Sequence, residues 1–528
     1  MRDFHFPGRS AVMATDGICA TSHPLAARTA VDVLRAGGNA ADAAIAAAMM
    51  LNTCEPQMCG LGGDAFALVK PPGSAEVIAL NGSGRAPEGL DAEALRGLGR
   101  SAIPLDRAEA VTIPGAVDLI CHLSAHHGTL PLSEVFAPAI DAADNGVPVA
   151  PRVAADWDSH AGRLQGQARA FYLDGAGAAP RAGQVFRAPH VAEVLRRIAA
   201  GGRAAFYEGE VAEDMARSLS AHGGSHTEAD FAATACTPGA PITGRYRGAD
   251  LLEHPPNGQG PTAILILNIL SHFDLTALDP IGAERLHLQA EATKLAYDAR
   301  DRFLADPDHM ARLDHMLAPE TAARLAGLID PARALPLPVA PRTEAVHRDT
   351  VYLCVVDRDR MAVSLIYSIF HAFGSGIASN RFGILFQNRG AGFTLERGHP
   401  NEAGPGKRPM HTIIPAMLAE GGRVTMPFGV MGGAYQPVGH AHVLGNLRDH
   451  GMDIQQAIDA PRAFAAEGTL ELERGIPDEV AQALEARGHK IVRRPAPLGG
   501  AQAIVIDHET GVLTGASDPR KDGCAIGY

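Results

Sequence analysis

The feature that most constrains the fold is an abrupt change of pattern near residue 350. Residues 330–349 are rich in proline, which is typical of an exposed connector rather than of an element in a core. Two apolar, β-branched runs follow, VYLCVVD and MAVSLIYSI, separated by a polar turn at residues 357–360. Such a pattern indicates a buried β-hairpin. The sequence therefore predicts that a core sheet begins immediately after an exposed segment.

The remainder of the chain predicts a mixture of helices and strands. Residues 26–51 indicate two helices separated by Gly37-Gly38, with Asn39 as the N-cap of the second helix. Apolar residues at three- and four-residue spacing make residues 114–329 mostly helical in pattern. The glycine-rich run CGLGGDAFALVK leads into a strand and has neither the spacing nor the ending of a phosphate-binding loop. A second hairpin is expected near the C-terminus, where AIVID and GVLTGA flank a polar turn.

Composition narrows the class of protein. The chain has 528 residues, of which 46% are apolar and 20% are charged, so it can bury a large core. The net charge is −13 and no basic run occurs, which argues against a nucleic-acid partner. The longest apolar stretch, residues 40–51, is interrupted by Asp42 and is shorter than the ~20 residues that cross a bilayer. It predicts a buried helix, and no membrane partner is expected.

Neither targeting nor metal binding is indicated by the sequence. The N-terminus MRDFHFPGRS lacks the apolar segment of a secretory signal, so we expect a cytoplasmic location. Seven scattered cysteines, an odd number, favour reduced thiols over a disulfide framework. Cys54 and Cys59 have no further ligands at metal-site spacing, and His122 and His126 lack the carboxylate of an HExxH motif. No metal site is therefore expected.

The pair Asp349-Thr350 lies between the connector and the first buried strand. A threonine hydroxyl is a weak nucleophile unless a base lies within hydrogen-bond reach. A threonine that begins a chain supplies this base itself, because its α-amine, with an ordinary pKa near ~8, lies close to the side-chain oxygen. Attack of the hydroxyl on the Asp349 carbonyl, followed by hydrolysis of the ester, would produce chains 1–349 and 350–528. Taken alone, however, an Asp-Thr pair is far more often the ordinary start of a strand.

A series of motifs distributed along the chain accompanies this pair. They are, in order, SHPLAARTAVDVLRAGGNAADAAIAA, CGLGGDAF, SGRAP, TIPGAV, FYEG, EATKLAYDARDRFLADP, DTVYLCVVDRDRMAVSLIYSIFHAFGSGI, GPGKRP, MGGAYQP, AIDAPR and GASDPRKDGCAIGY. In these motifs the sequence resembles γ-glutamyltranspeptidases along nearly its whole length. The resemblance implies an α/β (α+β) fold, a four-layer αββα sandwich of the N-terminal-nucleophile hydrolase type, in which a large chain 1–349 and a small chain 350–528 form one structural unit.

The same resemblance implies catalytic roles. Thr350 falls at the catalytic threonine that self-cleavage exposes. Ser368 falls where the family has a second threonine, whose hydroxyl binds the amine of the nucleophile. Gly432 and Gly433 match the glycine pair whose amides form the oxyanion hole. Without a Cβ the backbone can approach the developing oxyanion closely, and one such donor contributes ~3 to 4 kcal/mol.

The residues expected to hold a γ-glutamyl group have mostly changed. Glutamyl-specific members bind the α-carboxylate and the α-amino group with an arginine, an asparagine, an aspartate and two serines. These positions hold Ser83, Phe370, Gly392 and the pair His411-Thr412 here. The changes remove most of the charged groups that would grip a free amino-acid head group.

The retained nucleophile and the altered clamp together predict an amidohydrolase. Its expected substrate is a small amide with a carboxylate but no α-ammonium, as in the oxamate-type members that the sequence resembles. Arg85, His411, Thr412 and Gln436 are candidate substrate contacts, although purely structural hydrogen bonds would explain Arg85, His411 and Gln436 equally well. No cofactor is required, and the two self-cleaved chains are partners of each other.

Three alternatives remain open at this point. The protein could be a glutathione hydrolase or γ-glutamyl transferase proper, with transfer requiring an acceptor site that the sequence does not reveal. It could instead be an uncleaved, non-catalytic relative that binds a small ligand. A serine hydrolase is disfavoured because no GxSxG motif occurs and Ser375 has no assigned base.

Overall fold

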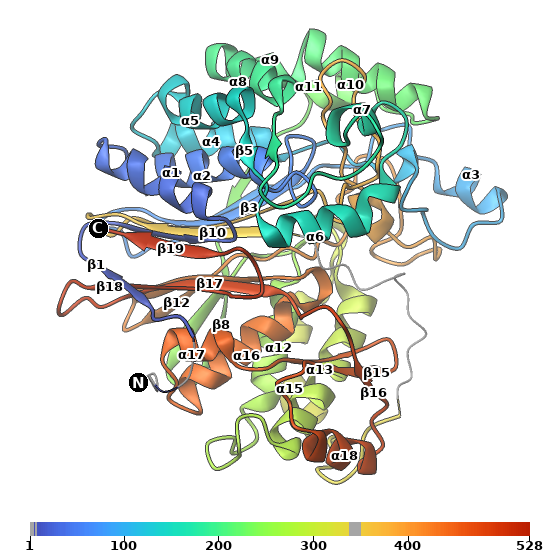
Figure 1. Cartoon of the computed structure of the whole chain (residues 1–528). Coiled ribbons are helices and arrows are strands. Elements are labelled where there is room, and N and C mark those ends of the chain that lie inside the picture. The colour runs from blue at the N-terminus through green and yellow to red at the C-terminus, as the bar shows by residue number, and fades with distance from the viewer. Residues whose placement is uncertain (1–4, 6–7, 337–349) are drawn as a thin grey trace.

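Two seven-stranded antiparallel sheets pack face to face in the computed structural model, which describes residue 5, residues 8–336 and residues 350–528. Helices cover the outer face of each sheet, so the architecture is a four-layer αββα sandwich (Figure 1). Sheet 1 contains, in spatial order, β19 (Cys524–Gly527), β2 (Ile18–Thr21), β10 (Val351–Val356), β11 (Ala362–Ser368), β3 (Asp64–Lys70), β4 (Ile78–Gly82) and β7 (Thr237–Gly239). Sheet 2 contains β1 (Val12–Ala14), β18 (Leu513–Ser517), β17 (Gly500–Ile506), β13 (Arg423–Met431), β12 (Ala416–Glu420), β9 (Ala249–Glu253) and β8 (Ile242–Tyr246).

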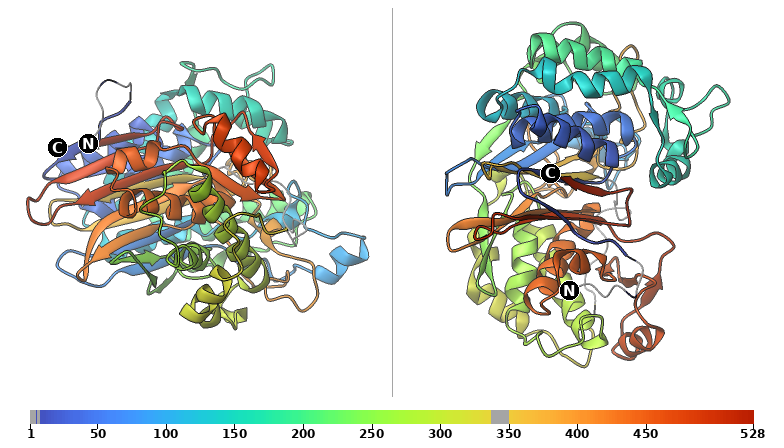
Figure 2. Two further views of the ribbon diagram at one scale, coloured as in Figure 1. Left: turned by 90° about the horizontal axis from the view of Figure 1, so that it is seen from below. Right: turned by 60° about the vertical axis from the view of Figure 1, so that its left-hand side comes forward.

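Each outer layer of helices closes its own hydrophobic core, and the two views of Figure 2 show the same layering. Sheet 1 is covered by α1 (Pro24–Arg35), α2 (Ala40–Cys54), α4 (Ala116–His127), α5 (Leu132–Asn145) and α8 (Pro189–Gly201). Sheet 2 is covered by α12 (Gly260–Leu270), α13 (Ala283–Phe303), α16 (Gln436–Arg448) and α17 (Ile454–Asp459).

The remaining elements are short and lie around this sandwich. The helices are α3 (Ala92–Gly97), α6 (Pro151–His160), α7 (Ala168–Tyr172), α9 (Ala204–Tyr207), α10 (Glu210–Ala221), α11 (Glu228–Ala232), α14 (Leu313–Leu317), α15 (Pro319–Ala326) and α18 (Asp478–Ala486), with 3-10 turns η1 (Ala108–Ala110), η2 (Ala161–Arg163), η3 (Pro307–His309), η4 (Arg389–Gly392) and η5 (Gly433–Tyr435). The strands β5 (Val147–Pro148) and β6 (Val185–Phe186) form a ribbon, and β14 (Ala463–Ala466), β15 (Thr469–Leu472) and β16 (Ile491–Arg493) form a small sheet.

The expected pair of helices near the N-terminus is confirmed as α1 and α2. Asn39 begins α2 with a reciprocal capping box, in which its side chain accepts from the Asp42 amide and the Asp42 carboxylate accepts from the Asn39 amide. All residues of α2 are buried, which its many alanines permit. The helix packs against β10 and β11 and so supports the centre of sheet 1.

Both expected hairpins are confirmed, as β10–β11 and β17–β18. Asp357, at the turn of the first hairpin, accepts hydrogen bonds from the amides of Ala40 and Met361, which ties this turn to the start of α2. Tyr352 of β10 faces sheet 2, where a Cβ at Gly429 would lie 2.5 Å from its ring. Glycine at that position therefore allows the two sheets to approach each other around Tyr352.

Three expectations need qualification. Residues 114–329 are mostly helical, but they also supply β8 and β9 at one edge of sheet 2 and the short edge strand β7 of sheet 1. Of the connector, residues 337–349 lie outside the described residues. His122 and His126 of α4 stack on each other with ring centroids 4.0 Å apart.

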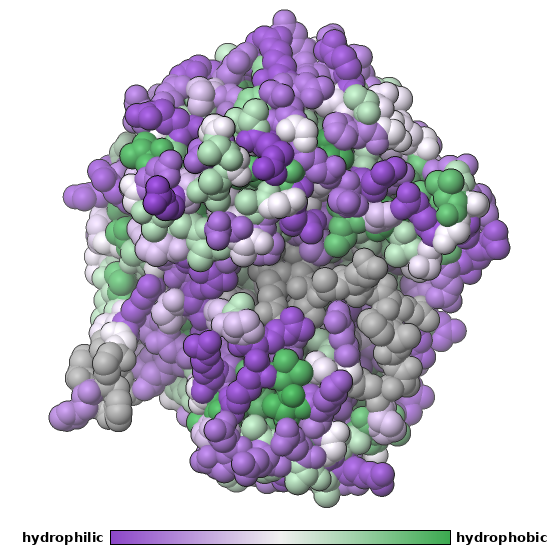
Figure 3. All heavy atoms as spheres, turned by 45° about the vertical axis from the view of Figure 1, so that its right-hand side comes forward, coloured by the Kyte–Doolittle hydropathy of each residue, from purple (hydrophilic) through white to green (hydrophobic). Residues whose placement is uncertain are grey.

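The surface carries no extended apolar patch on the face drawn in Figure 3, where hydrophilic residues predominate and apolar ones form small groups. The seven cysteines are all free thiols. None of the helices in the described part of the chain combines the length and apolar character needed to span a membrane.

Candidate active site

Thr350 lies at the rim of sheet 1, immediately before β10. Its side chain is fully buried, and its hydroxyl donates to Ser368 Oγ at 3.3 Å. Ser368 is the last residue of β11, so the antiparallel hairpin brings the two hydroxyl groups together. Ser368 Oγ also accepts from the Phe370 amide at 2.9 Å. The structure thus places the predicted nucleophile and its predicted hydroxyl partner side by side.

The predicted oxyanion-hole glycines lie at the end of β13. Gly432 has φ of +125° and Gly433 has φ of +55°, which are conformations that glycine adopts readily. A Cβ on Gly432 would lie 2.9 Å from the Cα of Gly499, so a side chain is excluded there by space as well. Gln259 Nε2 donates to the Gly433 carbonyl at 2.9 Å and to the Thr412 carbonyl at 2.6 Å. This amide fixes the glycine pair against the segment that contains Thr412.

His411 forms a buried pair with Asp64, the residue that pairs with Ser368 in the register of β11 and β3. His411 Nε2 lies 3.1 Å from Asp64 Oδ2, and both side chains are fully buried. Burial lowers the pKa of His411 well below its ordinary value, so the imidazole is neutral and donates to the carboxylate. Burial raises the pKa of Asp64 to about 6, opposed by Arg389 and by hydrogen bonds that include one from the Gly84 amide. His411 therefore supports the candidate site indirectly, through its hydrogen bond to Asp64.

Thr412 contacts an arginine that the sequence analysis did not single out. Arg389, the first residue of η4, donates from Nη1 to Thr412 Oγ1 at 2.8 Å. Its guanidinium carbon lies 3.9 Å from the centre of the Phe370 ring. The side chain is completely buried, and neither Nε nor Nη2 has a hydrogen-bond partner. Burial lowers the pKa of Arg389 to about 9, which leaves the guanidinium charged at neutral pH. The only indication of Arg389 in the sequence is its position, three residues before the altered position Gly392.

The other two predicted contacts have mainly structural partners. Arg85 Nη1 pairs with Asp306 Oδ2 at 3.2 Å and donates to the Gly406 carbonyl at 2.9 Å, and its side chain is about two-fifths exposed. Gln436 Oε1 accepts from the Ile414 amide at 2.9 Å, while its buried Nε2 has no partner. Gln436 thus joins the start of α16 to the segment that follows Thr412.

None of the residues at the substituted clamp positions has a carboxylate that could bind the ammonium group of a substrate. Ser83 Oγ donates to Asn81 Oδ1 at 2.7 Å, and a Cβ on Gly392 would lie 3.0 Å from the Met410 carbonyl. Asp64 is enclosed by hydrogen bonds from protein groups. The predicted cleavage residue Asp349 lies outside the described residues.

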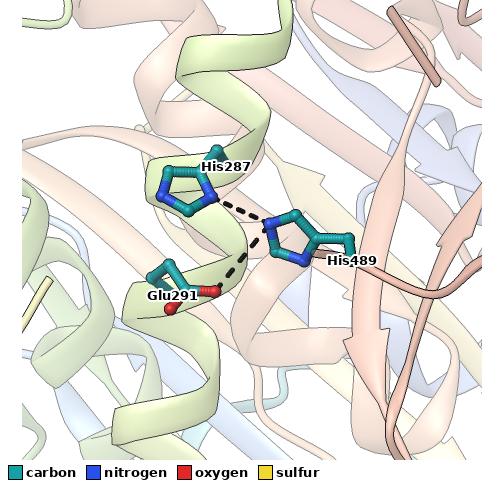
Figure 4. Close-up of side chains that lie close together, drawn as sticks. All are labelled: His287, Glu291 and His489. Atoms are coloured by element: carbon teal, nitrogen blue, oxygen red, sulfur yellow. Dashed lines mark hydrogen bonds and ion pairs between the residues drawn. The ribbon is translucent and has the colours of Figure 1, made fainter. Parts of the chain in front are cut away.

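A second cluster of polar side chains lies on α13 and after α18 (Figure 4). His287, Glu291 and His489 are buried, and their potential ligand atoms lie within 4.8 Å of one another. Glu291 already accepts from Lys294 Nζ at 2.6 Å and from the Leu335 amide at 2.7 Å. His287 Nδ1 and His489 Nε2 are 2.8 Å apart. A cation would have to displace the Lys294 ammonium, so the cluster is best described as a polar clamp between the segments before and after residue 350.

The fold and the site together define the class of protein. An antiparallel αββα sandwich, with a buried hydroxyl residue before a central strand and a glycine pair at the end of a strand in the facing sheet, is the arrangement of the N-terminal-nucleophile hydrolases. The chain belongs to the γ-glutamyltranspeptidase family, because the family model described as gamma-glutamyltranspeptidase matches residues 26–528. The expected family and fold are thereby confirmed.

Relatives along the full chain are hydrolases and acylases, and the protein is an enzyme of this kind. The chain is 36% identical to the glutathione hydrolase-like YwrD proenzyme of Bacillus subtilis, with 98% of this chain and 99% of the relative covered. It is 33% identical to the oxamate amidohydrolase proenzyme of Klebsiella pneumoniae, with 98% and 100% covered. The crystal structure of a cephalosporin acylase from Bacillus halodurans superposes with a TM-score of 0.92 at 38% identity, covering 100% of this chain and 99% of that one.

Proposed function

We propose that the protein is an autoprocessed amidohydrolase with Thr350 as its nucleophile. The observation that carries this proposal is the buried Thr350 hydroxyl, held 3.3 Å from the Ser368 hydroxyl at the start of a central strand. In the maturation step, Thr350 Oγ1 attacks the carbonyl carbon of Asp349 and the peptide C–N bond breaks. Water then hydrolyses the ester, leaving chains 1–349 and 350–528. The relatives described as proenzymes support a maturation of this kind.

The mature site uses the same atoms for substrate cleavage. The free α-amine of Thr350 accepts the hydroxyl proton as Oγ1 attacks the amide carbonyl, and it then delivers this proton to the departing nitrogen. The hydroxyl of Ser368 orients this amine. Amides of Gly432 and Gly433 stabilise the oxyanion. Water attacks the acyl-threonine ester in the second half-reaction, the amine takes the proton from water, and the acid product leaves as Oγ1 is reprotonated. No metal or organic cofactor takes part in these steps.

The substrate that we propose is a small amide that bears a carboxylate and no α-ammonium. The loss of acidic groups at the clamp positions, together with the buried Arg389, supports this choice. A relative described as an oxamate amidohydrolase and a structural relative described as a cephalosporin acylase also favour an acyl group other than γ-glutamyl. The second candidate is γ-glutamyl hydrolysis, which the relative described as glutathione hydrolase-like favours.

A denaturing gel and a substrate panel test both parts of the proposal. We expect wild type to run as two fragments and Thr350→Ala to remain one chain, while Thr350→Ser, which keeps the hydroxyl, is cleaved at least partly. The panel compares ammonia release from oxamate and glutamine with cleavage of glutathione and γ-glutamyl anilides. Efficient γ-glutamyl cleavage would establish the second candidate. An intact wild-type chain that turns over no amide would point instead to a non-catalytic binding protein.

A further inference from the structure

Two arginines in the described part of the chain are completely buried, and they differ in their partners. Arg462 pairs with Asp518, with Nη2 and Oδ2 2.5 Å apart. Arg389 donates a single hydrogen bond, to Thr412, and none of the described carboxylates lies within ion-pair distance of it. The buried carboxylate of Asp64 interacts with Arg389 electrostatically from beyond ion-pair distance, but Nε and Nη2 of Arg389 have no hydrogen-bond acceptor. Buried N–H groups without acceptors are destabilising, and a bound anion would supply the missing acceptors.

Arg389 lies beside the nucleophile through short links on both sides. On one side, its guanidinium covers the ring of Phe370, whose amide binds the Ser368 hydroxyl next to Thr350. Phe370 has φ of +76°, an uncommon and strained conformation for a bulky residue. This strained backbone is what presents the ring to the guanidinium.

On its other side, Arg389 is linked to the oxyanion-hole segment. Its Nη1 binds the side chain of Thr412, and Gln259 joins the carbonyl of Thr412 to that of Gly433. Two contacts therefore position the guanidinium: the Phe370 ring, which is linked to Ser368 and Thr350, and the Thr412 side chain, which is linked to Gly433. A group bound to it would belong to a molecule that also reaches Thr350.

The unpaired atoms of Arg389 define the chemistry of that group. Nε–H and Nη2–H lie on the same edge of the planar guanidinium and point in parallel directions. A carboxylate binds such an edge with two charge-assisted hydrogen bonds, and this geometry distinguishes it from a hydroxyl or an amide. Because Nη1 is occupied by Thr412, the free edge has a fixed orientation.

We propose that Arg389 is the specificity-determining residue of the site and binds the carboxylate of the acyl group through Nε and Nη2. The proposal rests on the proposed function, since it concerns substrates that acylate Thr350. It adds that the enzyme selects its substrates by the negative charge of the acyl group. The leaving amine does not contribute to this selection.

Pairs of amides that differ only in this charge provide the test. Oxamate is compared with pyruvamide by ammonia release, and succinyl and glutaryl p-nitroanilides are compared with their butyryl and valeryl counterparts. We expect wild type to prefer at least one carboxylated member by ~100-fold or more in kcat/KM, because two charge-assisted hydrogen bonds are worth ~3 kcal/mol or more. Arg389→Met should lose this preference, with kcat/KM for each carboxylated amide falling to about that for its neutral counterpart. Arg389→Lys, which keeps the charge without the two-donor edge, should fall between them.

Arg28→Met is the matched control, because Arg28 is exposed on α1 and its loss removes the same charge together with only an exposed ion pair to Asp32. An equal loss on charged and neutral amides in Arg389→Met, with self-cleavage intact, would show that Arg389 is structural and would overturn the proposal. So would a wild type that cleaves both members of every pair equally well.

A binding measurement separates this proposal from the proposed function. Oxamate, succinate or glutarate should raise the melting temperature of wild type and leave that of Arg389→Met unchanged. This result would support the Arg389 site even if wild type cleaved no amide, in which case the proposed function alone would fail. If none of the three anions stabilises wild type and no charged amide is preferred, the Arg389 proposal fails by itself.

Discussion

Methionine in place of each completely buried arginine should change the stability of the protein in opposite directions. Arg389→Met removes one charge-assisted hydrogen bond, worth about 1.5 to 3 kcal/mol, and a cation–π contact worth about 1 to 2 kcal/mol. It also removes two unsatisfied N–H groups, each destabilising by about 1 to 3 kcal/mol, and the desolvation of an unpaired charge. We expect the free energy of unfolding to stay constant or to rise by up to about 3 kcal/mol.

Arg462→Met has the opposite balance, because it removes one of the two arginines that pair with the buried carboxylate of Asp518, Arg520 being the other, and leaves two backbone carbonyls without this donor. Breaking a buried ion pair in this way destabilises a protein by about 3 to 5 kcal/mol. The two variants should therefore differ by about 3 kcal/mol or more. Both substitutions remove one buried guanidinium and add a flexible apolar side chain, so the comparison contrasts an arginine that has an ion pair and two further hydrogen bonds with one that donates a single hydrogen bond.

Urea unfolding of the mature protein at neutral pH provides the assay. Trp157 is the one tryptophan of the chain and is completely buried, so its fluorescence reports loss of packing beside sheet 1, while circular dichroism reports loss of the sandwich as a whole. Coincident transitions would justify a comparison of midpoints. If Arg389→Met were destabilised as much as Arg462→Met, Arg389 would be an ordinary core residue, and the inference of an anionic ligand would be refuted.

Three further predictions concern other parts of the site and the core. Thr350→Ala should show one band on a denaturing gel and no amidase activity, and two bands would remove Thr350 from self-cleavage. Gly432→Ala should lower kcat by at least about 100-fold, because a Cβ would meet Gly499 at 2.9 Å and displace an oxyanion donor; near-normal kcat would exclude that role. Burial raises the pKa of Glu55, which accepts a hydrogen bond from Ser22, to about 7. A carboxyl group with a raised pKa destabilises the fold as pH rises from about 4.5 through 7, so Glu55→Gln should gain stability relative to wild type by up to about 3 kcal/mol between pH 5 and pH 8 in thermal melts, and a constant difference would contradict the shift.

The central elements of the fold were predictable because their sequence signals are local. The β10–β11 hairpin consists of continuous apolar runs that are buried on both faces, and Asn39 and Asp42 mark the start of α2. The strands β8 and β9, at one end of sheet 2, were missed in a largely helical region, because strands of five residues with alternating burial carry little local signal. The arrangement of the two sheets came from the family resemblance, and pairing between distant strands supplies no local pattern of its own.

The candidate site was predictable where a residue type alone indicates its chemistry. Thr350, Ser368 and the glycine pair were placed by motifs, and the structure brings Thr350 and Ser368 into contact. The substrate contacts depend on partners far away in the sequence. Arg85 meets Asp306 and His411 meets Asp64, 221 and 347 residues apart. Arg389 could not have been identified in this way, because what distinguishes it is the burial of Nε and Nη2 without hydrogen-bond partners.

The order of strands in sheet 1 has a consequence for how a cut chain would behave. Strands from before residue 350 are interleaved with strands from after it, since β2 lies between β19 and β10, and β3 follows β11. A break at residue 350 therefore nicks one cooperative sheet and does not create two bodies that could part and rebind. The two products would be partners for the lifetime of the folded molecule, and mixing two preparations would not exchange their chains. Separately synthesised halves would have to fold together, because each contributes interleaved strands to the layer that holds Thr350.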